Sequence, residues 1–476
     1  MANVLGQLYP ERVWYYFESI SAIPRGSGNT KRIANYLCFF AKMHGLSYVR
    51  DKANNVVIRK DPTPGCEGAD GVILQGHIDM VCAKRPEITH DFLTDGLELR
   101  TDGETVSANG TTLGGDDGIA VAMMLAILES DSECIRHPAL EAVFTSDEEI
   151  GMVGAKQLDM SRLRHRVLLN LDSESEGILT VSCAGGSHTE VRLPFRRTGE
   201  PRKAYRVTIS GLLGGHSGAE IHKGRANAAV LAGRFLKDGK LSLISINGGE
   251  ADNAIMTSCT LHVCGNDVAE FAKREEAAFR AEYPNESVRI SVEEPKEAEI
   301  PSDLDLGGFL TQAPYGVRAW SRDIPGLVQT SLNVGVVRTE ENEVVLDYSV
   351  RSSVGKERDE LNAGLNALSK KYGGTVEISG EYPAWEYRKD SPLQKRMLRV
   401  YEELFGKTMK KEAIHAGLEC GLFADALKGL DAVSYGPDMR DIHTAGETLS
   451  IRSVERIWQY TLAVLEDMCP AEKEEF

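Results

Sequence analysis

The sequence predicts an α/β protein with a mainly parallel sheet and an α+β domain inserted into the chain. Three observations favour this fold class. Short apolar runs alternate with helical patterns in the first part of the chain, which is typical of a parallel sheet with covered faces. After about Cys183 this pattern changes to strands of alternating polarity and helices with a polar face. A chain of 476 residues is also too long for one ordinary core.

The first domain is expected to begin with two helices, over residues 11–19 and 30–44, separated by the loop IPRGSGN. Three apolar runs then predict buried strands, at residues 72–74, 142–145 and 167–171. The stretch GIAVAMMLAILES, which follows Asp117, predicts a strongly apolar helix between the first two strands. Strands and helices therefore alternate as they do in a parallel sheet.

The inserted domain is expected over residues 183–385, which leaves residues 1–182 and 386–476 to form one discontinuous domain. Two strand–helix–strand units fill the insert, and they match in the order of their elements rather than in their residues. The stretch EYPAWEYRKDSP marks its end. A separate layered domain of α+β type fits this pattern.

Composition excludes several classes of protein. A net charge of −17 argues against nucleic-acid binding, which needs a basic face. No run approaches the roughly 20 apolar residues of a membrane helix, and the N-terminus lacks the pattern of a secretory signal. The nine cysteines are scattered without a C-x-x-C pair, which argues against a disulfide framework or a thiolate zinc knuckle. A cytoplasmic location is expected.

The stretch QGHIDM contains the first candidate functional residues. His77 and Asp79 follow an apolar strand and are two residues apart, so in an extended chain they point to the same face. Asp147, Glu148 and Glu149 follow the strand at 142–145 in the same way. Ligands gather at the carboxyl ends of strands in α/β sheets. The sequence therefore predicts a functional site at this edge of the sheet.

Imidazole and carboxylate groups in this order predict a site for two divalent metal ions. The expected ligands combine two histidines with three carboxylates: His77, Asp116, Glu149, Asp172 and His443. Asp116 would bridge the two ions. Asp79 would orient His77 through its second ring nitrogen, and Glu148 would be the general base for a metal-held water. Zinc is the first choice, with manganese or cobalt as alternatives.

Each motif has a structural explanation when it is taken alone. A His-x-Asp pair at a strand end is usually structural, and DEE is usually a solvated acidic cluster or one near a helix N-terminus. The DDG stretch is usually a turn with a helix N-cap. His443 alone is uninformative. Only their occurrence together, in this order, favours the metal site.

The same residues resemble a zinc-dependent peptidase family that includes carnosinases, aminoacylases and desuccinylases, and within it the aminoacyl-histidine dipeptidase subgroup. The similar stretches run over nearly the whole chain: QGHIDMV, ANGTTLGGDDGIA, TSDEEIGMVGA, NLDSESEG, LLGGHSGAEIHKGRANA, GGEADNAI and IHAGLECGLF. The resemblance implies the ligand set above, catalytic roles for Asp79 and Glu148, and a lid formed by the insert. Asp117 stands where some relatives have Asn or Met, so it is given no ligand role.

The resemblance also implies residues that bind the substrate. His216 would help to hold the substrate carbonyl or its oxyanion; the alternative is a Gly-rich turn in which Ser217 caps a helix. Asn253 and Arg351 match lid positions suited to the peptide carbonyl and the C-terminal carboxylate. Glu419, in HAGLECG with His415, is suited to a free amino group.

The expected activity is therefore hydrolysis of unblocked dipeptides, including Xaa-His substrates such as β-alanyl-histidine, by a metal-activated water with Glu148 as the base. The partners would be small peptides, without nucleic acid or membrane, and relatives favour a homodimer. Two alternatives stay open. One is a related amidohydrolase, such as an aminoacylase or an aminopeptidase. The other is a non-catalytic metal-binding interaction protein on the same fold.

Overall fold

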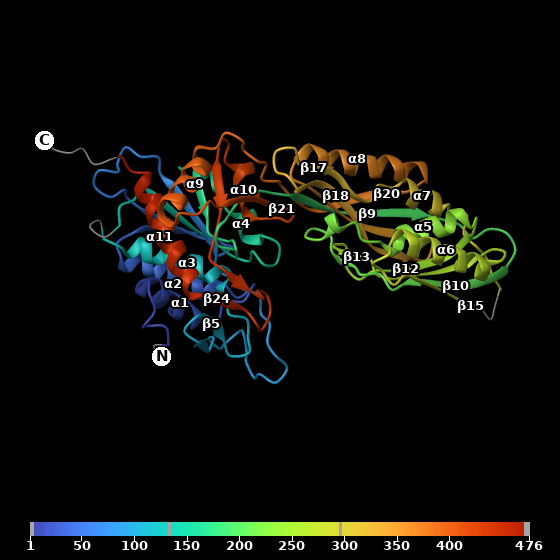
Figure 1. Ribbon diagram of the computed structural model, residues 1–476, viewed down its shortest axis with the longest axis horizontal. Coiled ribbons are helices and arrows are strands. Elements are labelled where there is room, and N and C mark those ends of the chain that lie inside the picture. Colours follow the sequence, from blue (N-terminus) through green and yellow to red (C-terminus); the bar gives the residue numbers. More distant parts are fainter. Residues whose placement is uncertain (1–3, 132–134, 295–297, 471–476) are drawn as a thin grey trace. The chain divides into compact units, whose positions relative to one another are not determined.

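The computed structural model describes residues 4–131, 135–294 and 298–470 of the chain (Figure 1). Two compact units divide the chain. The first comprises Met1–Ser182, Tyr387–Ala413 and Leu418–Phe476, and the second comprises Cys183–Glu386 and Ile414–Gly417. The short segment Ile414–Gly417 thus belongs to the second unit, although the sequence analysis grouped it with the C-terminal segment.

An eight-stranded sheet forms the centre of the first unit. Its strands lie in the order β1 (Ser47–Arg50), β2 (Val56–Lys60), β6 (Leu140–Thr145), β3 (Val72–His77), β7 (Val167–Asn170), β22 (Asp431–Ser434), β8 (Ile178–Cys183) and β21 (Lys410–Ile414). The four strands from β6 to β22 pair in parallel. Antiparallel pairs join β1 to β2, β2 to β6 and β22 to β8. The predicted parallel sheet is therefore its centre, with antiparallel flanks.

The central strands are buried on both faces. Every residue of β3, β6 and β22 is buried, as expected for apolar strands of a parallel sheet. The helices of this unit are α1 (Glu11–Ser21), α2 (Lys31–Met43), α3 (Gly115–Glu129), α4 (Val153–Gln157), α9 (Pro392–Phe405), α10 (Glu419–Ala426) and α11 (Ile451–Asp467). Helix α3 is buried around its whole circumference between α1 and β3, which explains its uniformly apolar sequence.

A second, four-stranded sheet in this unit was not predicted. It runs in the order β23 (Met439–Arg440), β24 (Thr448–Ser450), β5 (Thr105–Ala108) and β4 (Leu99–Thr101). Strand β24 pairs with β5, and β5 ends a few residues before α3 begins. The sheet therefore connects the last part of the chain to the segment that leads into α3. The loop between β23 and β24 carries His443.

The second unit contains a ten-stranded sheet whose described pairs are all antiparallel. Its main path is β15 (Arg289–Glu293), β10 (Arg202–Ser210), β14 (Cys259–Cys264), β12 (Ser242–Gly248), β18 (Val328–Thr339), β19 (Glu343–Ser352), β9 (Gly185–Pro194) and β20 (Thr375–Tyr382), with β16 (Ala298–Glu299) beside β10 and β17 (Gly316–Trp320) beside β18. Its helices are α5 (Ala228–Asp238), α6 (Val268–Glu282), α7 (Leu306–Gln312) and α8 (Gly355–Lys371). A small pair, β11 (Gly215–His216) with β13 (Ala254–Ile255), carries His216.

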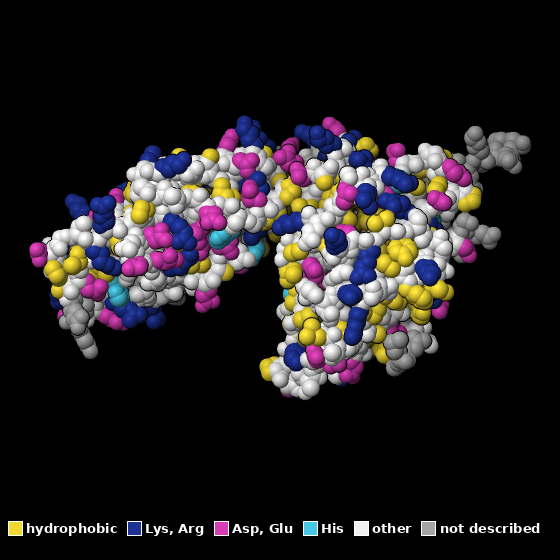
Figure 2. Space-filling view, turned by 180° about the vertical axis from the view of Figure 1, so that it is seen from behind, with side chains coloured by type: hydrophobic (Ala, Val, Ile, Leu, Met, Phe, Trp, Pro, Cys, Tyr) yellow, Lys and Arg dark blue, Asp and Glu magenta, His cyan; other side chains and the backbone are white. Residues whose placement is uncertain are grey.

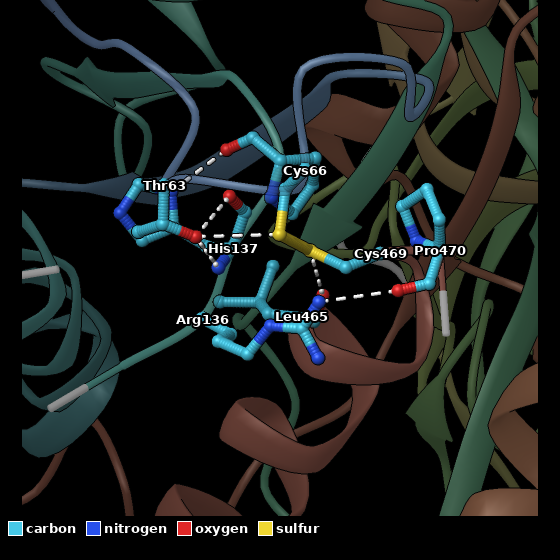
Figure 3. The surroundings of a disulfide bond; sticks show 8 residues. Thr63, Cys66, Arg136, His137, Leu465, Cys469 and Pro470 are labelled. Atoms are coloured by element: carbon cyan, nitrogen blue, oxygen red, sulfur yellow. Dashed lines mark hydrogen bonds between the residues drawn. A yellow bond between two sulfur atoms is a disulfide. The ribbon is translucent and has the colours of Figure 1, made fainter. Parts of the chain in front are cut away.

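A disulfide joins Cys66 to Cys469 across 403 residues of sequence (Figure 3). The sequence analysis argued against a disulfide framework and did not predict this single pair. Cys66 is fully buried, and the Thr63 hydroxyl donates to its sulfur at 3.3 Å. Arg136 donates to the carbonyl of Pro470 at 3.1 Å, which adds a second link at the same place. The disulfide fastens the end of α11 to the segment between β2 and β3.

We expect loss of this disulfide to destabilise the first unit. A cross-link over a long loop restricts the unfolded chain, so Cys469→Ser should lower the free energy of unfolding by roughly 2–4 kcal/mol. Thermal unfolding with and without dithiothreitol measures the effect, and Cys38→Ser, which alters a free cysteine, is the matched control. Equal midpoints for wild type and Cys469→Ser under oxidising conditions would show that the bond adds no stability.

The helices and the charged side chains of the surface were compared with what the composition predicts. Within the described ranges, no helix has the length and apolar character needed to span a membrane. Acidic and basic side chains are interspersed over the face drawn in Figure 2.

Candidate metal centre

The carboxyl ends of three central strands bring the predicted ligands to one edge of the first unit's sheet. His77 is the last residue of β3, Glu149 follows β6, and Asp172 follows β7. Asp116 lies in the first turn of α3, and His443 lies in the loop after β23. Because β3, β6 and β7 are parallel neighbours, their ends adjoin.

His77 forms the first group of candidate ligands. Its Nε2 atom lies 3.0 Å from Asp116 Oδ1 and 3.8 Å from Asp172 Oδ1. His77 is almost completely buried, with 1% of its side chain exposed. The other ring nitrogen, Nδ1, lies 3.5 Å from Asp79 Oδ1. Asp79 is thus placed to fix the orientation of the ring, as the sequence analysis expects.

His443 forms the second group. Its Nε2 atom lies 3.1 Å from Asp116 Oδ2 and 3.0 Å from Glu149 Oε2. The backbone of His443 is left-handed, with φ of 61°, a conformation that side chains other than glycine rarely adopt. Such outliers gather at functional sites, where the surrounding structure holds them in place.

Asp116 belongs to both groups, because each of its carboxylate oxygens faces a different histidine. The candidate ligand atoms within each group lie within 4.8 Å of one another. All five predicted ligands are therefore brought together, in two groups that share one carboxylate. Asp117 belongs to neither group; its Oδ2 accepts the backbone N–H of His77 at 3.1 Å.

The centre holds more acidic groups than its two imidazoles can balance. Burial raises the pKa of Asp172 well above its usual range, and the neighbouring Asp116 adds to this. Burial likewise raises the pKa of Glu148 to about 8, helped by Glu419 and Glu149. Hydrogen bonds to Asp116 and Glu149 raise the pKa of His443 to about 10. Carboxylates that crowd together in this way are stabilised by bound cations.

The donor set fits divalent ions. Imidazole nitrogens and carboxylate oxygens suit zinc and similar metals. Glu149 Oε1 is also buried and, among the described residues, has no hydrogen-bond partner. A buried carboxylate oxygen is costly to leave unpaired, and a metal ion would satisfy it.

Glu148 lies beside both groups without belonging to either. Its backbone N–H donates to Asp79 Oδ1 at 3.0 Å, and the N–H of Glu149 donates to Asp79 Oδ2 at 3.3 Å. Ser27 donates its hydroxyl to the same carboxylate at 2.8 Å. Asp79 therefore holds the segment that carries Glu148 and Glu149, and it lies 3.5 Å from Nδ1 of the His77 ring.

Glu447 is a positioning residue that sequence reasoning missed. Its carboxylate accepts the backbone N–H groups of Leu113, Gly114 and Gly115 at 2.7, 2.9 and 2.8 Å, and that of Asp116 at 3.3 Å. A carboxylate is favourable at a helix N-terminus, where these N–H groups lack helical partners. Since Glu447 is four residues after His443, it joins the loop that carries one candidate ligand to the helix that carries another.

We expect Glu447→Ala to weaken metal binding by roughly 10–100-fold, the usual cost of losing a group that holds a ligand in place. Competition against a chelator, followed by metal analysis, measures the change. Glu466→Ala, which removes an exposed acidic side chain near the end of α11, is the control. Unchanged metal affinity in Glu447→Ala would contradict the positioning role.

The second unit places His216 at a turn. Nδ1 of His216 accepts the backbone N–H groups of Gly218 at 3.2 Å and Ala219 at 3.1 Å, which leaves Nε2 as the protonated nitrogen of a neutral ring. Burial and the charge of Arg351 lower its pKa. The alternative explanation is right about the turn, which residues 217–219 form, and wrong about the cap, because Ser217 Oγ caps no helix and has no partner among the described residues.

Asn253 and Arg351 lie in the same unit. The carbonyl of Asn253 accepts the N–H of Ser217 at 2.7 Å, so the loop of Asn253 is fastened to that of His216. Arg351, in β19, donates Nη1 to the Tyr382 hydroxyl at 3.0 Å, while its buried Nε has no partner among the described residues. No ion pair among the described residues includes Arg351, so this guanidinium is available to an anion.

His415 is next to this group in the second unit. Its Nε2 atom lies 2.7 Å from Ser331 Oγ. Burial, together with the charge of Arg351, lowers its pKa to about 3, so the ring is neutral. The sequence analysis quoted His415 as part of a motif without giving it a role.

Glu419 is not part of the group in the second unit. It begins α10 in the first unit and is fully buried. Its Oε2 atom accepts Gln75 Nε2 at 2.5 Å and Thr145 Oγ1 at 2.6 Å, while Oε1 has no partner among the described residues. Burial raises its pKa to about 8. Glu419 therefore lies at the carboxyl ends of β3 and β6, near Glu148.

The candidate metal ligands and the match to a peptidase family together define the class of protein, which is a metallopeptidase. The chain belongs to peptidase family M20/M25/M40, whose sequence pattern matches residues 73–467. The family resemblance inferred from the motifs is thus confirmed.

Two relatives are similar over nearly the whole chain. The chain is 36% identical to the cytosol non-specific dipeptidase of Escherichia coli (strain K12), over 98% of this chain and 99% of the relative. It is also 36% identical to the crystal structure of aminoacylhistidine dipeptidase from Vibrio alginolyticus, with a TM-score of 0.90 and 98% of each chain covered. An aminopeptidase structure from Bacillus cereus, 16% identical with a TM-score of 0.60 over 98% of this chain and 100% of that one, shares the fold.

Proposed function

We propose that this peptidase hydrolyses unblocked dipeptides, Xaa-His substrates such as β-alanyl-histidine among them. The observation that carries the proposal is Asp116, which faces one histidine with each oxygen while Glu148 lies alongside. Similarity at 36% identity to two dipeptidases supports the substrate class.

Two divalent ions would be held by the two groups of residues that share Asp116. One ion would take His77 and Asp172, and the other would take His443 and Glu149. Zinc suits these donors best, and manganese and cobalt are alternatives. When bound, such ions polarise a scissile carbonyl and lower the pKa of water.

Glu148 would take the proton from the attacking water and pass it to the leaving amine. A general base must lie within reach of that water and be free of other strong partners. The side chain of Glu148 accepts no hydrogen bond within the described part of the chain, whereas its backbone is fixed by Asp79. Asp79, whose Oδ1 lies 3.5 Å from Nδ1 of His77, would also orient the ring.

The second unit would act as a lid that supplies contacts to the substrate. The neutral His216 ring would donate its Nε2 proton to the substrate carbonyl or the oxyanion formed from it. Asn253 would bind the peptide carbonyl, and Arg351 would bind the C-terminal carboxylate. In the first unit, the unpartnered Oε1 of Glu419 would receive the free amino group.

We expect Arg351→Gln to lower kcat/KM for a dipeptide by roughly 10–100-fold, because a charge-assisted hydrogen bond to the carboxylate is lost. The same dipeptide with a C-terminal amide should be a poor substrate for wild type and variant alike. Arg358→Gln is the matched control, since Arg358 pairs with Asp359 and Glu381. An equal loss on the free acid and the amide would contradict carboxylate recognition.

A substrate panel tests the proposed function. β-Alanyl-histidine, several α-dipeptides, a tripeptide and an N-acetyl amino acid are each assayed after chelation and after zinc, manganese or cobalt is restored. Metal-restored cleavage confined to dipeptides supports the proposal. Cleavage of the acylated or longer substrates alone would move the protein to an aminoacylase or aminopeptidase branch, and no cleavage with any metal would favour a non-catalytic binding protein.

The cellular setting completes the proposal. The relative from Escherichia coli is named for the cytosol, which supports a cytoplasmic location for this chain. We propose a homodimer, for which sedimentation of the metal-loaded protein is the test.

A further inference from the structure

A cavity of about 410 Å³ lies in the first unit at the opposite edge of the sheet from the metal centre. Gly71 precedes β3, Val167 begins β7, and Asp431 begins β22, and all three line the cavity. These parallel strands therefore start at the cavity and end at the other edge. His77, at the far end of β3, is about 20 Å away along the strand.

Basic side chains outnumber acidic ones in the wall of this cavity. It is lined by four arginines, one histidine and two aspartates: Arg164, Arg166, Arg388, Arg396, His165, Asp70 and Asp431. Such a concentration of arginine is unexpected on a chain whose net charge is −17. Arg164, Arg166 and Arg388 are exposed to solvent, and their convergence on one cavity favours the binding of an anion.

The two aspartates do not neutralise these arginines. Asp431 is engaged by the N-terminus of α9, where it accepts the Ser391 hydroxyl at 2.5 Å and the Leu393 N–H at 3.1 Å. Its closest approach to Arg388 is 3.9 Å. Asp70 takes part in no ion pair among the described residues and is exposed.

The arginines differ in their own partners. Arg396 is paired with Asp467, which lies outside the cavity wall, at 2.9 Å. Neither the guanidinium of Arg164 nor that of Arg166 has a carboxylate partner within the described part of the chain, although the backbone N–H of Arg164 donates to Glu141 Oε2 at 2.8 Å. Two guanidinium groups are therefore left without a counter-charge, and Arg388 has only a distant one.

Two of these guanidinium groups are held in place by backbone carbonyls. Arg166 Nη1 donates to the carbonyls of Leu163 at 3.2 Å and His165 at 2.7 Å. Arg388 Nη1 donates to the carbonyl of Gly429 at 3.3 Å. Each of these bonds uses Nη1 alone. The geometry is thus fixed in advance while other N–H groups stay available, which lowers the entropic cost of binding a ligand.

Gly71 shapes the wall beside them. A Cβ atom at this position would lie 2.2 Å from Cε1 of His165, so only glycine allows the imidazole to pack against the start of β3. The ring is thereby held in the wall of the cavity, between Arg164 and Arg166 in the sequence.

We propose that this cavity binds a small molecule that carries a phosphate group, held by Arg164, Arg166 and Arg388. Arginine presents a planar fork of donors that matches phosphate oxygens. A tetrahedral dianion accepts such forks from several sides at once, whereas a carboxylate has only two oxygens. The volume is within the range of small-molecule sites and exceeds what a bare phosphate ion fills.

Calorimetric titration of the metal-loaded, full-length protein tests the proposal. The probes are inorganic phosphate, a sugar phosphate and AMP, with acetate at equal ionic strength as the control for screening. We expect the phosphate compounds to bind and acetate not to bind. The double variant Arg164→Gln/Arg166→Gln should weaken binding by roughly tenfold or more, because charge-assisted hydrogen bonds are lost. Tighter binding of the sugar phosphate or AMP than of inorganic phosphate would identify an organic ligand.

Controls separate this site from the metal centre, where phosphate is also able to bind. The double variant Arg100→Gln/Arg274→Gln removes the same charge from exposed positions and should bind as wild type does. Arg164→Gln/Arg166→Gln should retain dipeptide hydrolysis and its melting temperature in acetate. Equal phosphate affinity in both double variants, or no binding to the wild type, would overturn the proposal and leave the proposed peptidase function untouched.

Discussion

Glu148→Ala should retain its metal ions and lose most of its turnover. Removing a general base costs roughly 10²–10⁴-fold in rate. Glu148 belongs to neither group of candidate ligands, so the metal content should stay at the wild-type value. Steady-state kinetics on a dipeptide, with metal analysis of the same sample, measures both quantities.

The neighbouring carboxylate provides the control for this variant. Asp147 accepts the Gly28 N–H at 2.7 Å and has a left-handed backbone, with φ of 53°. Asparagine tolerates that conformation and keeps an acceptor oxygen, so Asp147→Asn should be nearly as active as wild type. Normal activity in Glu148→Ala would contradict the role of Glu148 as general base. A loss of metal in this variant would indicate that Glu148 is a metal ligand.

Asp116→Ala should have the largest effect on metal content. Each of its two oxygens faces a different histidine, so its removal disrupts both groups at once. We expect almost no tightly bound metal and a loss of activity of at least 10³-fold, since metal activation of water is lost.

A variant that affects only one of the two ligand groups provides the comparison for Asp116→Ala. His443→Ala affects only the group that contains Glu149, so it should retain about one ion per chain through His77 and Asp172, consistent with three-ligand sites. Thermal unfolding of both variants confirms that they are folded. If Asp116→Ala and His443→Ala lose the same amount of metal, Asp116 does not bridge two ions.

The candidate ligands could be predicted because their chemistry is visible in residue types. Histidine and aspartate at the end of an apolar strand, as at His77 and Asp79, stand out against the preceding run. Strand order then brings Glu149 and Asp172 to the same edge without any knowledge of side-chain positions. The uniformly apolar sequence of α3 likewise indicates a helix buried on all sides.

Other parts of the site depend on contacts that residue types do not encode. Glu447 acts through backbone N–H groups of residues 113–116, and every residue except proline has such a group. The Cys66–Cys469 pair closes across 403 residues, and spacing alone does not reveal such a pairing. The antiparallel flanks of the central sheet were not predicted, because the apolar sequence of a strand such as β8 does not show in which direction the neighbouring strand runs.

The residues expected to bind the substrate show what family resemblance alone does not predict. His216 and Asn253 were singled out by family resemblance, and their loops are joined through the Ser217 N–H. Glu419 was also assigned to the substrate, and it lies in the first unit, where its carboxylate accepts hydrogen bonds from Gln75 and Thr145. Resemblance singles out such residues, whereas the fold shows which unit carries each of them.

Stepwise loading of the metal-stripped protein tests the central claim, that two groups sharing Asp116 form one dipeptidase centre. Zinc is added in fractions of one equivalent per chain, and bound metal and hydrolysis of β-alanyl-histidine are measured at each step. We predict two equivalents bound with high affinity, and full turnover only as the second is filled. Full turnover at one equivalent, or two equivalents bound without turnover on any dipeptide, would contradict the account.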